Sequence, residues 1–88
     1  MEILEDYLNN NRKLEYNIKP DGVSDIIRKH VIGVGISVKD AKENAIYKLV
    51  KKAEISGCNT IVHYNPFCVY NGSSCYFYLS GALLKHKT

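Results

Sequence analysis

The helix expected between Asp40 and Gly57 most constrains how this 88-residue chain can fold. Asp40 is a suitable N-cap, Glu43 stands three residues later as in an acidic capping box, and Gly57 suits the left-handed position after a helix. Between these caps, apolar residues recur at the spacing of one buried stripe: Ala41, Ala45, Ile46, Leu49, Val50 and Ala53. The pattern predicts an amphipathic helix whose small residues let it lie close to a sheet.

Strand patterns flank this helix on both sides. Residues 30–38 alternate, with apolar side chains at even positions from Ile32 and glycine at Gly33 and Gly35. We expect the apolar face beneath the helix and the glycine face open to another backbone, a ring or a ligand. Thr60 begins the second strand, expected to be parallel to the first through a right-handed connection. The two glycines lie within a strand and lack a third glycine, so they do not indicate a dinucleotide site.

The last third of the chain has the pattern of a hairpin. Residues 67–70 and 75–84 form its predicted arms around Asn71-Gly72, where a type I′ turn would place Cys68 opposite Cys75. Pro66 predicts a bulge or an edge position, because proline cannot donate to the sheet.

The first residues have weaker signals. Residues 1–11 have the spacing of a short helix, 14–18 alternate like a short strand, 19–22 form a turn, and 23–27 indicate an irregular turn or a short strand. The predicted fold class is α+β, with one long amphipathic helix packed on a small mixed sheet of about four strands. We expect a single domain over residues 1–88, with a divergent entry segment at 1–29 and a strand–helix–strand–hairpin core at 30–84.

The composition of the chain limits the classes of partner that we expect. The net charge of +3 comes from lysines and arginines that are spread along the chain, so nucleic acid is not an expected partner. No apolar run approaches the roughly 18 residues of a membrane span and the N-terminus is acidic, so we expect no membrane contact and a cytoplasmic location. A domain this small buries only about 60–65% of its unfolded surface, which favours self-association.

Several residues are candidates for an interface between subunits. Tyr47 and Ile55 lie on the helix away from the buried stripe, either as ordinary exposed residues or as contacts with a neighbouring subunit. The second sheet face carries aromatic residues that the entry segment or another subunit would cover. The candidate interface residues are Tyr47, Ile55, Gly33, Gly35, Tyr76 and Tyr78.

Three cysteines and one histidine are candidates for a metal site: Cys58, Cys68, Cys75 and His63. Two thiolates and an imidazole would suit copper(I) or zinc. Strict alternation puts His63 and Cys68 on opposite faces of the sheet, unless a bulge at Pro66 reverses it. The alternatives are small buried thiols or, in an oxidising setting, a Cys68–Cys75 disulfide. The histidines have no convincing acid–base partners in the sequence, so we expect a protein that is not an enzyme.

The helix and the second strand resemble the YbjQ-like family, whose members are classed as heavy-metal-binding proteins. The helix positions Ala41, Ala45, Leu49 and Ala53 carry the resemblance, together with Gly57-Cys58-Asn59, Ile61-Val62 and Gly81-Ala82. The resemblance covers about residues 30–84; the family usually has alanine where Cys58 stands, and residues 1–29 do not match its N-terminus.

The resemblance implies a compact α+β domain that assembles into a homopentameric ring. Similar methanogen proteins bind selenium through cysteine. Two functions follow as hypotheses: a homo-oligomeric binding protein for a heavy metal or another soft ligand, or an interaction module whose ring surface binds a macromolecular partner without a ligand or catalysis.

Overall fold

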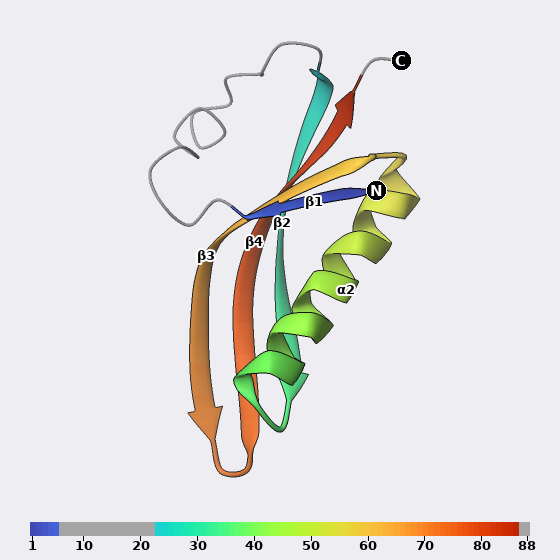
Figure 1. Ribbon diagram of the computed structural model, residues 1–88. Coiled ribbons are helices and arrows are strands. Elements are labelled where there is room, and N and C mark those ends of the chain that lie inside the picture. Colours follow the sequence, from blue (N-terminus) through green and yellow to red (C-terminus); the bar gives the residue numbers. More distant parts are fainter. Residues whose placement is uncertain (6–22, 87–88) are drawn as a thin grey trace.

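A four-stranded mixed sheet with one helix on it forms the protein (Figure 1), as seen in a computed structural model that describes residues 1–5 and 23–86. The elements are β1 (Glu2–Glu5), β2 (Val23–Gly35), α2 (Val38–Ser56), β3 (Thr60–Asn71) and β4 (Ser74–His86). The strand order is β1-β3-β4-β2, with β1 parallel to β3 and the other pairs antiparallel. The predicted α+β class is confirmed.

Ser37 caps the helix at its N-terminus, so the prediction of Asp40 as N-cap was wrong. Ser37 is extended, with φ −140° and ψ 166°, and its hydroxyl accepts a hydrogen bond from the Asp40 backbone N–H at 3.2 Å. Asp40 instead lies in the first turn, where its negative charge favours the helix dipole. Gly57 ends the helix with φ 73°, as predicted.

The glycine face of β2 lies beneath α2, which reverses the predicted orientation of this strand. A Cβ on Gly33 would stand 2.5 Å from the Ala45 backbone nitrogen, and one on Gly35 would stand 2.6 Å from that of Ala41. Ile32 and Val34 point to the opposite face and are exposed. The close approach that the glycines were expected to permit is therefore made by the helix of the same chain.

The N-terminal residues form a strand where a helix was predicted. Glu2 to Glu5 pair in parallel with Thr60 to His63, and the Glu2 N–H donates to the Asn59 carbonyl at 3.0 Å. The helical spacing of the apolar residues is overridden here by pairing with a distant strand. β2 begins at Val23, so residues 23–27 are strand; the elements predicted at 14–18 and 19–22 lie outside the described residues.

The central strand β4 separates the two strands that flank the helix. Both β2 and β3 are antiparallel to β4, so they run parallel to each other as predicted. The main core lies between the sheet and α2 and includes Val31, Leu49, Ile61, Phe77 and Leu79. A smaller cluster on the other face contains Val62, Tyr64, Ala82 and Leu84.

A bulge in β3 confirms the irregularity that Pro66 predicted. Tyr64 pairs with Ser80 and Phe67 pairs with Tyr78, so β3 advances three residues while β4 advances two. Asn65 takes a positive φ of 52° at this point, a conformation that asparagine tolerates better than most residues. The extra residue reverses the alternation of β3, which places both His63 and Cys68 on the helix face.

The hairpin turn lies one residue later than predicted. Asn71 pairs with Ser74, so Gly72 and Ser73 are the central residues; Gly72 has φ 66° and Ser73 has no positive φ, as in a type II′ turn. Cys68 consequently pairs with Phe77, and the predicted Cys68–Cys75 register is wrong.

Candidate functional site

Cys68 and Cys75 form a close pair of thiols on the helix face of the hairpin. Tyr70, two residues after Cys68, pairs with Cys75, so the two cysteines are diagonal neighbours across β3 and β4. Their Sγ atoms lie 2.7 Å apart and both cysteines are free. Cys75 is fully buried and Cys68 is half-buried, so a ligand would reach the pair from the Cys68 side.

Cys75 holds its proton tightly in this pair. The hydrogen bond with Cys68 and, after it, burial raise the pKa of Cys75 to about 11. Burial and the two neighbouring thiols also raise the pKa of the Tyr70 hydroxyl. The Cys75 thiol is therefore protonated at physiological pH, and a cation that binds its sulfur must displace this proton.

His63 and Cys58 lie away from this pair. His63 pairs with Gly81, which is four residues along β4 from the partner of Cys68, a separation of about 13 Å at the rise of a strand. Cys58 follows the helix at the start of β3 and belongs to the core. Within residues 1–5 and 23–86, no three histidine, cysteine or acidic side chains form a group that could hold a metal ion. The structure brings together two of the four predicted ligands.

His63 lies buried opposite Glu5 of the neighbouring strand β1. Burial lowers the pKa of His63 from its usual 6.5; the Glu5 carboxylate opposes this shift, and the Lys42 ammonium adds to it. Lys42 also forms an ion pair with Glu5 at 3.1 Å. His63 is thus a neutral imidazole in the core at pH 7.

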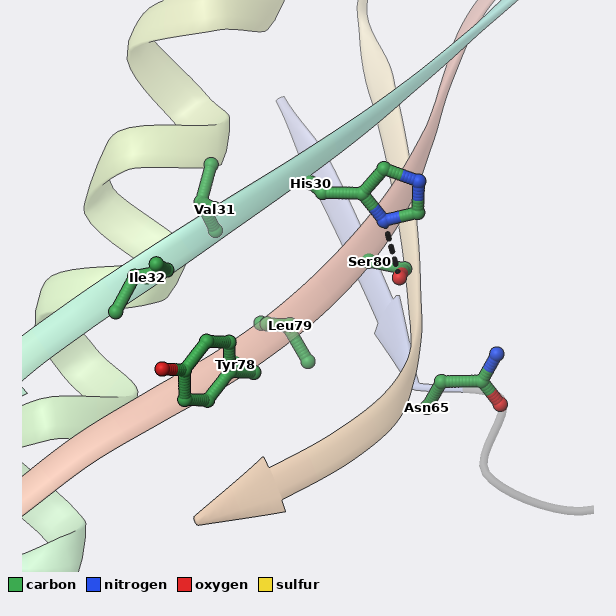
Figure 2. Close-up of a pocket in the computed structure, with 7 residues that line it drawn as sticks. All are labelled: His30, Val31, Ile32, Asn65, Tyr78, Leu79 and Ser80. Carbon is green, nitrogen blue, oxygen red and sulfur yellow. Dashed lines mark hydrogen bonds between the residues drawn. The ribbon is translucent and has the colours of Figure 1, made fainter. Parts of the chain in front are cut away.

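A second candidate site is a cavity of about 350 Å³ at the bulge (Figure 2), which the sequence did not reveal. The His30 ring nitrogen Nδ1 lies 2.7 Å from the Ser80 hydroxyl, and Asn65 and Tyr78 line the same cavity. Pro66, which predicted a bulge or an edge position, was the signal in the sequence for an irregular backbone at this point. The cavity has polar groups but no ionised pair, so it suits a small neutral molecule better than a metal ion.

The apolar face is an exposed patch on the side of the sheet opposite α2. Pairing brings its members into two rows, Ile32–Tyr78–Phe67 and Val34–Tyr76–Val69. Phe67 and Tyr78 also make a tilted ring contact, with centroids 6.1 Å apart. Contiguous apolar surface of this kind is typical of an interaction site.

The other predicted interface residues divide into two groups. Tyr47 and Ile55 are exposed on the outer side of α2, and the Lys51 ammonium lies 5.3 Å from the Tyr47 ring centroid. Gly33 and Gly35 lie under α2 of the same chain, and their part in an interface stays a prediction.

Comparison with protein-family models, curated proteins and solved structures finds no match for this chain. The resemblance to the YbjQ-like family and the ring of five therefore stay predictions. Within the described part of the chain, no helix combines the length and the apolar character that crossing a membrane requires.

Proposed function

We propose that this chain is a small homo-oligomeric protein that binds a soft heavy-metal ion through Cys68 and Cys75. The observation that carries the proposal is the 2.7 Å separation of the two Sγ atoms on adjacent strands of one hairpin. Two thiols that a sheet already holds together lose little further freedom when they bind the same ion. The role is binding, with no catalytic step.

Copper(I) fits this pair better than zinc does. Thiolate is a soft ligand that selects copper(I), whereas structural zinc takes four protein ligands. The described residues supply two sulfurs here, and His63 lies too far along the sheet to join them. Cys75 at the buried end would shield the ion from water, and the half-buried Cys68 would admit it.

Anaerobic titration with copper(I), followed by native mass spectrometry, tests this function. We expect one ion for each chain in the wild type, and a loss of about a hundredfold in affinity in Cys68→Ser and in Cys75→Ser. Cys58→Ser is the matched control, because Cys58 is buried between α2 and β3, away from the hairpin end of β3, and this variant should bind copper(I) as the wild type does. A wild type that stays bare, or a Cys58→Ser variant that loses the ion, would contradict the proposal.

A second candidate function is an interaction module without a ligand, and the apolar face favours it. Six apolar side chains from three strands form one surface, and the exposure of this surface to water is unfavourable. Under this alternative, the wild type takes up no copper(I), and Tyr78→Glu abolishes assembly or partner binding while the double variant Cys68→Ser/Cys75→Ser leaves it unchanged.

A further inference from the structure

The outer edge of β2 is closed by side chains of α2. The Val34 N–H donates to the Asn44 side-chain oxygen at 3.0 Å, and the Lys48 ammonium donates to the Ile32 carbonyl at 2.7 Å. An added strand would need these backbone groups. Earlier in β2, the strand carries Arg28 and Lys29, and charged side chains also discourage strand addition at an edge.

Among residues 1–5 and 23–86, no strand pairs with the outer edge of β3 over residues 67–71. β1 pairs with β3 only as far as His63, and beyond it no other strand among the described residues lies on that side. Figure 1 shows the hairpin half of β3 as the outermost strand, with β1 alongside the other half only. Phe67 and Tyr70 on this segment are 64% and 67% exposed. In the part of the chain that the structure describes, the two edges at the hairpin end of the sheet therefore differ, because α2 closes the edge of β2 and no strand covers the edge of β3.

The open edge is also uncharged. Residues 55–84 contain no aspartate, glutamate, lysine or arginine, and the edge segment reads Phe-Cys-Val-Tyr-Asn. Aromatic and β-branched residues favour strand pairing, and charges are the usual protection of an edge. A neutral strand can face a copy of itself without like-charge repulsion, so its own sequence is a suitable partner.

We propose that residues 67–71 pair with the same segment of a second copy of this chain. The pairing is antiparallel about a twofold axis at Val69 and joins the two sheets into one. Head-to-tail pairing would need two open edges on each copy, and the closed edge of β2 leaves one at the hairpin end. The product is a twofold dimer in place of the ring of five that the resemblance implies.

Full overlap of the two segments fixes the register. Val69 faces Val69 of the second copy, and Cys68 faces Tyr70 of the second copy. The two Cys75 side chains are then separated by three strand spacings, about 14 Å, so the four sulfurs cannot hold one ion. Each copy keeps its own thiol pair. The inference deepens the homo-oligomeric part of the proposed function, and it is independent of the ligand.

A charge exchange at Val69 tests the dimer, with mass measured by light scattering after gel filtration. Val69 is 36% exposed, so a charged side chain fits the folded monomer. Val69→Lys alone and Val69→Glu alone should each dissociate about a hundredfold more readily, because like charges face each other at the axis. A one-to-one mixture of Val69→Lys and Val69→Glu should restore the dimer, because opposite charges then face each other. The control is Ile55→Lys, at an 86% exposed position on α2, which should stay dimeric.

Several results would overturn the dimer: a monomeric or pentameric wild type, a dimeric Val69→Lys, a mixture that does not recombine, or dissociation of Ile55→Lys. Circular dichroism establishes that each variant is folded, and Phe67→Lys replaces Val69→Lys if the latter unfolds. Copper(I) titration of Val69→Lys separates the two proposals, because both thiols remain. A monomer that still binds the ion supports both the edge pairing and the thiol site. A monomer that does not bind it contradicts only the thiol site.

Discussion

Gly33 lies so close beneath Ala45 that a Cβ on Gly33 would stand 2.5 Å from the Ala45 backbone nitrogen. Real Cβ atoms do not approach backbone this closely, and the helix backbone cannot rotate away as a side chain can. The absence of a side chain at position 33 therefore sets the distance between α2 and the sheet.

Gly33→Ala should lower the free energy of unfolding by about 3 kcal/mol, because the helix must shift away from the sheet. Urea denaturation measures this change. Gly57→Ala is the control: its Cβ would meet open space, and only the left-handed φ of 73° is strained, which costs about 1 kcal/mol. Equal losses in the two variants would contradict the role of helix–sheet contact.

Leu49 and Gly81 should show strong energetic coupling. A Cβ on Gly81 would stand 2.8 Å from a methyl carbon of the fully buried Leu49 side chain. Leu49→Ala should cost about 3–4 kcal/mol through the cavity it leaves. Gly81→Ala should destabilise the wild type, yet cost less or nothing in the Leu49→Ala background, where the new methyl group enters the cavity. A double-mutant cycle by urea denaturation measures the coupling, and additive effects would contradict it.

Ser37→Ala should cost about 1 kcal/mol, because it removes the hydroxyl that accepts from the Asp40 N–H. Asp40→Ala should cost less, roughly 0.5 kcal/mol, because it removes only a favourable charge in the first turn. Thermal denaturation of the two variants gives the order. A larger loss of stability in Asp40→Ala than in Ser37→Ala would indicate that Asp40 is the N-cap.

Stability should fall as the pH drops below 6.5, because burial keeps His63 neutral in the folded chain. The unfolded chain takes up a proton near pH 6.5 that the folded chain accepts only at lower pH, so acid favours unfolding, and above pH 6.5 this contribution is constant. Urea denaturation across this range measures it. His63→Gln should flatten the decline, and a His63→Gln variant whose stability declines as that of the wild type does would contradict this account.

Copper(I) affinity should rise with pH, because the ion must displace the proton of Cys75, whose pKa is about 11. We expect about a tenfold gain for each pH unit between 7 and 9. Competition with a copper(I) chelator measures it, with Cys58→Ser as a control that keeps the slope. An affinity that does not change with pH would place the ion elsewhere.

The sequence predicted the elements where local signals agreed. The alanine stripe of α2 and Gly57 at its end act within one helix, so the helix and its C-terminus were correct. The bulge at Pro66 was also correct, because a missing N–H is a local property.

The errors in β1 and β2 share one physical cause, which is that each depends on a contact distant in sequence. Alternation gives β2 two faces that the sequence alone cannot tell apart. The close approach of α2 decides that the helix packs on the face of Gly33 and not on the face of Ile32. Glu2–Glu5 became a strand through pairing with β3. A shift of one residue in the hairpin turn moved Cys68 from Cys75 to Phe77, yet diagonal contact still joined the sulfurs.

The bulge at Asn65 decides which of the later side chains of β3 face the helix and which face the opposite side of the sheet. Before the bulge, odd-numbered side chains such as His63 face the helix; after it, even-numbered ones such as Cys68 do. Deleting one residue here would leave the composition almost unchanged but would exchange the inner and outer side chains of the hairpin arm. Cys68 would then move to the opposite face from Cys75. The position of the thiol pair is thus encoded by a count of residues as much as by the cysteines themselves.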